Sequence, residues 1–160
     1  MSRKFLIGAA SAGHQVEGNN TNSDTWAQEY METGGYKEKS LNAADHYHTY
    51  REDICKMAKA GLNAYRFSFE WARIEPEEGR FDETEMNHYL DMVHACQESN
   101  IEPVVTLLHF TCPKWLITKG GWEADTTPDY FERYVRYVCN HLQGEELHYI
   151  VTINEANMGT

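Results

Sequence analysis

The stretch Ile150-Val151-Thr152-Ile153-Asn154-Glu155 indicates both a fold and a chemistry. Its first four residues are β-branched, which predicts a buried strand, and the two residues that follow are polar. In a parallel barrel the side chains at the carboxyl ends of the strands form the active site. A carboxylic acid beside an amide can transfer a proton to a bound oxygen and hold a hydroxyl group. The alternative is that Asn154 and Glu155 cap a following helix.

The sequence upstream alternates between predicted strands and predicted helices. Apolar runs or alternation predict strands over residues 4–8, 63–69 and 103–108. Amphipathic spacing predicts helices over residues 45–60, 83–99 and 127–142. Residues 19–42 and 113–122 are expected to be loops, the first anchored by Trp26. This alternation requires parallel strands joined by crossover helices, so the fold class is α/β.

Two architectures have such strands: a small doubly wound sheet and part of an eight-stranded barrel. The doubly wound sheet normally carries a glycine-rich phosphate loop such as GxGxxG, and that pattern does not occur here. Polar or aromatic residues instead follow every predicted strand. They are Gln15, Arg66, Trp71, His109, Asn154 and Glu155. Because carboxyl ends of parallel strands share one face, these residues are predicted to converge at a barrel mouth.

Two of these residues have more than one interpretation. An arginine within a strand is costly unless it is paired, so Arg66 is either half of a structural ion pair or the partner of an active-site carboxylate. His109 ends a strand as either a hydrogen-bonded core residue or a ligand contact. The sequence alone favours the core role for His109.

Charge and composition exclude several classes of partner. The net charge of −11 disfavours nucleic acid and anionic membrane surfaces, so we expect a small neutral partner. No apolar run approaches a membrane span, and the apolar run near the amino terminus is too short for a secretory signal, so a cytoplasmic location is expected. The four cysteines are far apart without a CxxC pair, and the histidines of His46-Tyr47-His48 start a predicted helix. We therefore expect no disulfide, no metal and no cofactor.

Six stretches of the sequence together resemble the β-glucosidase family of retaining glycoside hydrolases, family one of that classification. Their order and spacing carry the likeness, which runs from Phe5 to Glu155. The stretches are residues 5–18 with Gln15-Val16-Glu17-Gly18, Asp45-His46-Tyr47, Tyr65-Arg66-Phe67-Ser68 with Trp71-Ala72-Arg73, Thr106-Leu107-Leu108-His109-Phe110, Gly120-Gly121-Trp122 and Thr152-Ile153-Asn154-Glu155.

The resemblance implies a (β/α)8 barrel, of which residues 1–160 would be the part that ends after strand four. It also implies a role for each matching residue. Glu155 is similar to the general acid/base, Asn154 to the residue that holds the sugar 2-hydroxyl, Gln15 and His109 to binders of the remaining hydroxyls, and Arg66 to the cation beside the nucleophile. Trp122 is similar to an aromatic residue near the sugar, with packing in a loop as the alternative.

Three departures from the family pattern bear on activity. Retaining hydrolysis needs a raised acid pKa and a second, ionised carboxylate roughly 5–5.5 Å away. The family supplies that nucleophile from a Thr-Glu-Asn-Gly type motif on strand seven, and the motif does not occur in this sequence. Ala156 stands where the family usually has proline, which relaxes the backbone constraint on Glu155. Phe110 stands where many members have tryptophan.

Two hypotheses follow. The first is the amino-terminal portion of a β-glycosidase that hydrolyses terminal β-linked sugars, nearly inactive alone, with glucose, galactose and 6-phospho sugars all open as the glycone. The second is an inactive half-barrel that serves as a sugar-binding or structural module. Open parallel edges would leave backbone groups unpaired, so self-association through the sheet edges is expected of an isolated half.

Overall fold

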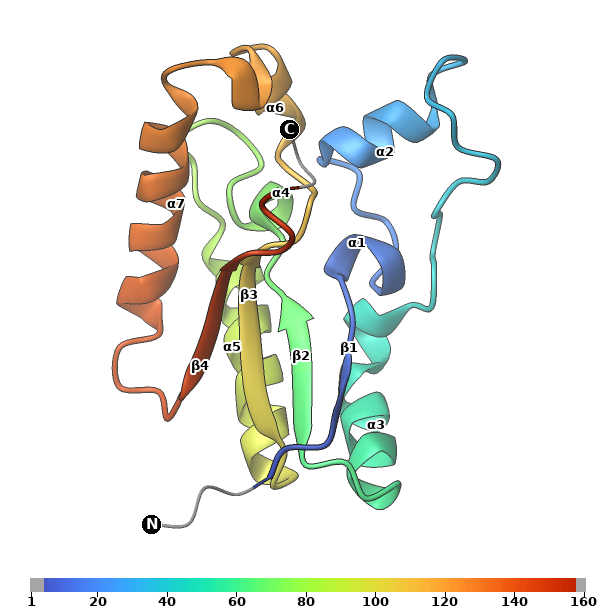
Figure 1. Ribbon diagram of the computed structural model, residues 1–160, viewed down its shortest axis with the longest axis vertical. Coiled ribbons are helices and arrows are strands. Elements are labelled where there is room, and N and C mark those ends of the chain that lie inside the picture. The colour runs from blue at the N-terminus through green and yellow to red at the C-terminus, as the bar shows by residue number, and fades with distance from the viewer. Residues whose placement is uncertain (1–4, 158–160) are drawn as a thin grey trace.

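In the computed structural model, which describes residues 5–157, four parallel strands form one sheet in the order β1-β2-β3-β4 (Figure 1). The strands are β1 (Gly8–Ala10), β2 (Ala64–Ser68), β3 (Glu102–Leu108) and β4 (Tyr149–Ile153). Each strand therefore pairs with its sequence neighbour, as successive β-α units do. The predicted parallel α/β arrangement is confirmed, and all four carboxyl ends lie at one end of the sheet.

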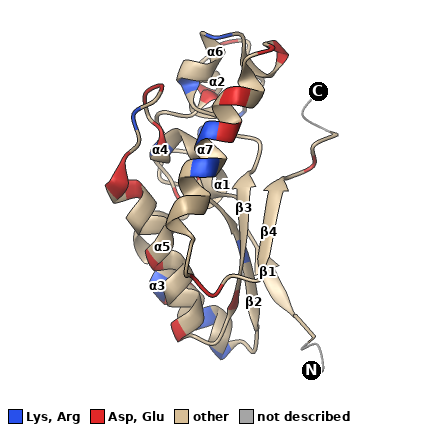
Figure 2. Ribbon diagram, turned by 90° about the vertical axis from the view of Figure 1, so that its left-hand side faces the viewer, with Lys and Arg blue, Asp and Glu red and all other residues tan. Residues whose placement is uncertain are grey.

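The three long crossover helices lie on one side of the sheet, and within residues 5–157 the other side of the sheet carries no helix (Figure 2). They are α3 (His46–Lys59), α5 (Glu83–Glu98) and α7 (Thr127–His141), within about two residues of their predicted bounds. α5 begins where it does because the Asp82 carboxylate accepts hydrogen bonds from the backbone N–H groups of Thr84 and Glu85. Its buried residues recur at helical spacing and face the sheet.

Aromatic side chains fill the space between β2 and the helices. Tyr65, Phe67 and Phe69 project from β2 towards this layer, and Phe69 stacks on Tyr89 of α5 with ring centroids 4.9 Å apart. All four are at most 2% exposed, so β2 is the centre of the core. The edge strands differ, because large apolar residues beside β1 and in β4 are exposed. These are Phe5, Ile7, Tyr149 and Ile150.

Five short helices and one strand boundary depart from the predicted elements. β1 begins at Gly8, whereas the predicted strand covered residues 4–8, of which Lys4 lies outside the described residues. The predicted loop over residues 19–42 contains a helix that begins where the Ser23 hydroxyl accepts from the Trp26 N–H. Helices of three to six residues are too short to produce a periodic pattern. They are α1 (Gly13–Val16), α2 (Asp24–Glu29), α4 (Trp71–Ile74), α6 (Lys114–Ile117) and the 3-10 helix η1 (Gly121–Glu123).

None of the helices within residues 5–157 combines the length and the apolar character that crossing a bilayer requires.

His88 joins α5 to α3 without a hydrogen bond from its ring Nε2. Its ring stacks on Tyr47 with centroids 3.9 Å apart and meets the edge of Tyr50 at 5.1 Å. Nε2 is buried and has no partner among the described residues. Burial, with the positive charge of Arg73 as a second cause, lowers the pKa of His88 from 6.5 to about 4. The folded chain therefore holds this imidazole neutral.

Stability should fall in acid because of His88. Between pH 6.5 and about 4 the unfolded chain binds a proton at His88 that the folded chain does not, so unfolding becomes easier as the pH falls through this window. We expect His88→Phe, which keeps the stacking, to reduce this acid-side loss by on the order of 1 kcal/mol. Urea denaturation at several pH values measures it. The control is His94→Phe on the same helix, which should lose as much stability in acid as the wild type. If the free energy of unfolding changes with pH equally in the wild type and in His88→Phe, His88 is not the cause of the acid-side loss.

Candidate active site

Arg66 connects three neighbouring strands at their carboxyl ends. It projects from β2, its Nε donates to Thr106 Oγ1 of β3 at 2.8 Å, and its Nη2 donates to Asn154 Oδ1 after β4 at 2.6 Å. No carboxylate within residues 5–157 forms an ion pair with Arg66. Within these residues Arg66 is therefore not half of a structural ion pair. The guanidinium instead fixes the orientation of the Asn154 amide, whose Nδ2 makes no hydrogen bond among the described residues.

Asn154 and Glu155 lie in a turn that follows β4. Asn154 is 9% exposed and its backbone N–H continues the sheet by donating to the Leu108 carbonyl at 2.9 Å. Residues 154–157 form a turn, so the structure as far as residue 157 shows no helix for these residues to cap. Glu155 is exposed and has φ of 46°, a left-handed conformation that non-glycine residues seldom adopt. Such strained residues cluster at functional sites.

A cavity of about 240 Å³ brings Trp122 and Glu155 together. Phe110 forms part of its wall and, like Glu155, has a positive φ, of 68°, two residues beyond its strand. Trp122 reaches the cavity from η1, and its indole N–H is 3.1 Å from Cys112 Sγ. The lining residues are Leu108, Phe110, Trp122, Ile153, Asn154, Glu155 and Ala156. The loop after β3 and the turn after β4 therefore make one wall of a site.

His109 lies at the end of β3, half-buried, within electrostatic reach of Arg66 and Glu155. Burial lowers its pKa, the positive charge of Arg66 lowers it further, and the negative charge of Glu155 opposes them. Its Nδ1 is buried without a hydrogen-bond partner among residues 5–157. A neutral imidazole with an unused nitrogen can bind a hydroxyl group, and the core role that the sequence favoured for His109 would require a partner at this atom.

Gln15 lies in α1, the short helix that follows β1, with its side chain exposed. It is not among the residues that line the 240 Å³ cavity, and neither is His109. The structure thus brings together five of the predicted residues: Arg66, His109, Asn154, Glu155 and Trp122. Gln15 lies at the same end of the sheet, in the helix that follows β1, the strand next to β2 (Figure 1).

Buried acids beneath these residues were not predicted from the sequence. Glu17 is 2% exposed and accepts hydrogen bonds from Arg73 Nε at 2.9 Å and from the Tyr89 hydroxyl. Glu70 is 1% exposed and directly follows the apolar strand β2. Burial raises the pKa of both carboxyls. An acidic residue between Phe69 and Trp71, in an otherwise apolar run, was the sequence signal for a buried and hydrogen-bonded carboxylate.

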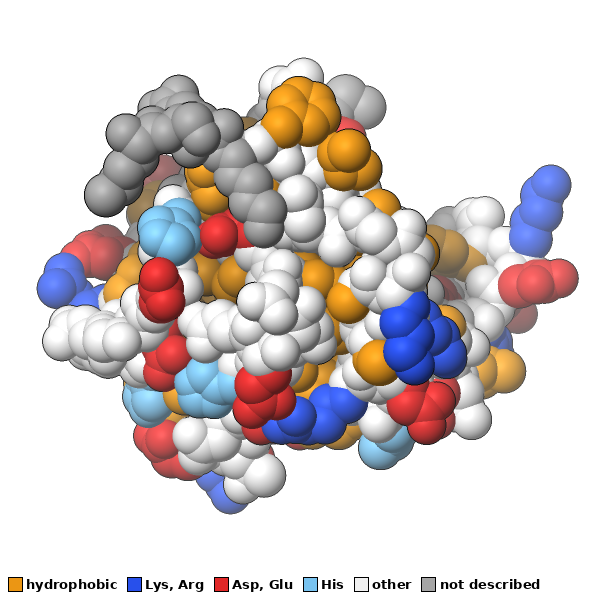
Figure 3. Space-filling view, turned by 90° about the horizontal axis from the view of Figure 1, so that it is seen from below, with side chains coloured by type: hydrophobic (Ala, Val, Ile, Leu, Met, Phe, Trp, Pro, Cys, Tyr) orange, Lys and Arg blue, Asp and Glu red, His pale blue; other side chains and the backbone are white. Residues whose placement is uncertain are grey.

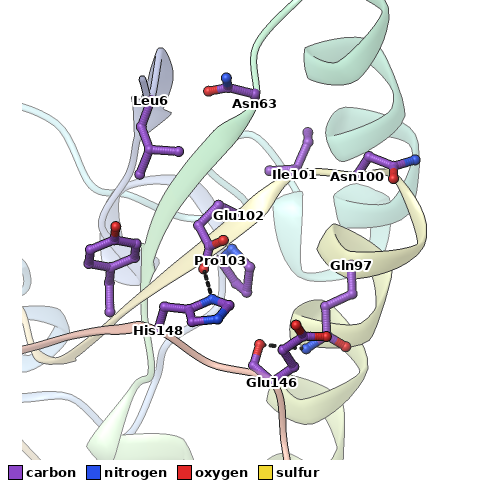
Figure 4. Close-up of a pocket in the computed structure, with 10 residues that line it drawn as sticks. Leu6, Asn63, Gln97, Asn100, Ile101, Glu102, Pro103, Glu146 and His148 are labelled. Carbon is purple, nitrogen blue, oxygen red and sulfur yellow. Dashed lines mark hydrogen bonds and ion pairs between the residues drawn. The ribbon is translucent and has the colours of Figure 1, made fainter. Parts of the chain in front are cut away.

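A second cavity, of about 500 Å³, lies at the opposite end of the sheet (Figure 3). Its lining includes residues that precede strands, such as Asn63 before β2 and Ile101 before β3. On its wall His148 Nδ1 is paired with Glu102 Oε1 at 2.9 Å (Figure 4). Active sites of parallel barrels form at the carboxyl ends of the strands, and the amino ends contribute stability. The larger cavity is therefore not the candidate site.

Curated proteins with similar sequences are β-glycosidases. The chain is 37% identical to coniferin beta-glucosidase of Pinus contorta, over 96% of this chain and 31% of that protein. It is 35% identical to 6-phospho-beta-galactosidase of Clostridium acetobutylicum, over 95% of this chain and 32% of that protein. The chain thus spans about a third of the length of these relatives.

Solved structures and a family model agree with these relatives. A crystal structure of a β-glycosidase matches with a TM-score of 0.92 and 51% identity, over 96% of this chain and 36% of that chain. The beta-glucosidase from Thermotoga maritima in complex with cyclophellitol matches with a TM-score of 0.88 and 32% identity, over 97% of this chain and 37% of that chain. The model of glycosyl hydrolase family 1 matches residues 1–160. The chain therefore belongs to glycosyl hydrolase family 1, and its four parallel strands are an amino-terminal part of the (β/α)8 barrel of that family.

Proposed function

We propose that this chain supplies the acid/base side of a retaining β-glycosidase active site. Family membership supports the reaction class, and the observation that carries the assignment of residues is the Arg66–Asn154 hydrogen bond beside Glu155. In this proposal Glu155 protonates the leaving oxygen and later deprotonates the attacking water. Trp122, on the same cavity wall, stacks against the sugar or the leaving group.

The hydroxyl-binding roles follow from the donors and acceptors that remain unused. Because Asn154 Oδ1 accepts from Arg66, the Asn154 Nδ2 is the group that donates to the sugar 2-hydroxyl. His109 binds another hydroxyl through its neutral ring, and Gln15 binds a third from α1. The proposed pocket is incomplete within this chain, since its cavity of about 240 Å³ is below the 300–1,000 Å³ that is typical of ligand pockets.

The nucleophile of the proposed reaction lies outside residues 1–160. Arg66 makes its two hydrogen bonds through Nε and Nη2, which leaves Nη1 to face a carboxylate supplied by a later strand. We propose that residues 1–160 form one partial barrel domain whose catalysis needs that second carboxylate. The proposed substrate class is a terminal β-linked sugar, with its phosphorylated counterpart as an alternative because relatives of both kinds match.

A sugar-binding or structural half-barrel without turnover is the second candidate. The observation that favours it is the exposure of Phe5 (81%) and Ile7 (56%) at one edge of the sheet and of Tyr149 (47%) and Ile150 (45%) at the other. Two copies that cover these edges would self-associate. Light scattering of the purified chain tests this candidate, and a monomer at all concentrations would contradict it.

The role of Glu155 can be tested in a complete barrel. We would replace the corresponding part of the Thermotoga maritima β-glucosidase with residues 1–160 and assay nitrophenyl and methyl β-glucosides. Glu155→Gln should lower kcat by about 10²–10⁴-fold for the methyl glucoside, whose leaving group needs protonation, and by less for the nitrophenyl glucoside. Glu98→Gln on the exposed end of α5 is the matched control. Equal losses with both substrates, or no loss, would refute the general-acid role.

The isolated chain tests the role of Arg66 in binding. We expect it to bind a nitrophenyl β-glucoside without turnover and with the sugar held by Asn154. Arg66→Lys lacks the planar fork that donates to Thr106 and to the Asn154 amide at once, so affinity measured by calorimetry should fall about tenfold or more. Arg136→Lys, an exposed arginine of α7, should leave affinity unchanged. Unaltered affinity in Arg66→Lys would remove Arg66 from the site.

A further inference from the structure

A single buried carboxylate lies beneath three of the strand ends that carry the candidate site. Glu70 Oε2 accepts hydrogen bonds from Asn20 Nδ2 and from Thr111 Oγ1, both at 2.7 Å. Glu70 Oε1 accepts from Ser68 Oγ at 3.1 Å. Asn20 lies after β1, Thr111 lies after β3, and Ser68 is the last residue of β2. The side chain of Glu70 therefore connects segments that are 50 and 41 residues away from it in sequence.

Each connected segment carries a candidate sugar-binding residue close by. The Gly13 N–H donates to Ser68 Oγ at 2.7 Å, and Gly13 is the first residue of the helix that carries Gln15. The Thr111 N–H donates to the His109 carbonyl at 2.9 Å, so both residues belong to one turn. The carboxylate thus binds the turn of His109 directly, through Thr111. It is connected to the helix of Gln15 through one intermediate, the Ser68 hydroxyl.

The packing around the carboxylate allows little adjustment. A Cβ atom on Gly13 would lie 2.6 Å from both Cγ and Oε1 of Glu70 and 2.9 Å from Glu17 Oε1, so no side chain fits there. Asn20 and Thr111 are also buried, at 2% and 5% exposed. An apolar side chain in this position would leave the buried donors of Asn20, Thr111 and Ser68 without an acceptor. A carboxylate differs because it offers up to about four acceptor sites, and three of them are used.

We propose that Glu70 is a positioning residue: its buried carboxylate holds the segments after β1 and β3 in register and so places Gln15 and His109 for the sugar. The proposal rests on the proposed function for the roles of Gln15 and His109. Its geometric part, the coupling of the two segments through Glu70, does not require a sugar.

The coupling can be measured by NMR without any ligand. Thr111→Val removes one donor to Glu70 while keeping the shape of the side chain. The resonances of the Asn20 side-chain amide and the Gly13 backbone N–H, both in the segment after β1, should then shift. Thr118→Val is the matched control, because the Thr118 hydroxyl donates only to the Trp115 carbonyl of its own turn. Shifts that stay near Thr111, or equal shifts in both variants, would overturn the proposal.

Affinity for phenyl β-thioglucoside tests the consequence for binding. Glu70→Met removes both acceptor oxygens, and with them all three hydrogen bonds, and should weaken binding about tenfold. Glu70→Gln keeps one oxygen and should give an intermediate loss. Glu75→Met is the control: Glu75 is buried at the other end of α4 from Glu70, and it accepts from Trp71, Gly79 and Arg133. Equal losses in the Glu70 and Glu75 variants would overturn the positioning role.

The two experiments distinguish this proposal from the proposed function. If the wild-type chain binds no glucoside, the proposed function fails and the NMR shifts alone decide whether Glu70 couples the two segments. If Glu70→Met does not fold, Thr111→Val supplies both measurements, with Thr118→Val as control. Binding by wild type together with unchanged affinity and unchanged shifts in Thr111→Val would leave the sugar site standing and refute the role of Glu70.

Discussion

The need to satisfy buried carboxylates beneath the strand ends constrains the whole of this structure. Glu17, Glu70 and Glu75 are each at most 2% exposed, in the region where strands end and helices begin. An ionised acid removed from water is destabilising unless charged or hydrogen-bonding groups surround it. Arg73, Asn20 and Arg133 meet this need from segments far away in sequence. Arg73 in α4, Arg133 in α7 and Asn20 in the loop after α1 are therefore held in place by these carboxylates. Glu70 also binds Thr111, which belongs to the turn of His109.

Arg66 extends this constraint to the open side of the sheet. Its guanidinium spans β2, β3 and the turn after β4, so the orientation of Asn154 depends on the register of three strands. The structure therefore has two layers of polar contacts at one end of the sheet. The first layer consists of the buried carboxylates and their partners, and it joins distant segments to one another. The second layer is Arg66 with Thr106 and Asn154, which lies beside the cavity and has donors that are not used. Preorganisation of this kind is what allows a rigid scaffold to place groups for catalysis.

The edges of the sheet explain why the site is incomplete within these residues. β1 and β4 have exposed apolar neighbours, and the face away from the helices is uncovered within residues 5–157 (Figure 2). A closed barrel removes both edges and completes the wall opposite Glu155. The relatives are about three times as long as this chain.

The sequence by itself determined the order of the long elements and the residues that follow each strand. Apolar periodicity is a local property, so α3, α5, α7, β2, β3 and β4 could be placed from it. The four-residue helices could not, because they contain about one turn. The partner of Arg66 could not be found in this way, since Asn154 lies 88 residues away. Only the tertiary structure decided the contacts of Glu70 and the left-handed backbone of Phe110 and Glu155. These features arise from packing between distant segments, which overrides what each residue prefers locally.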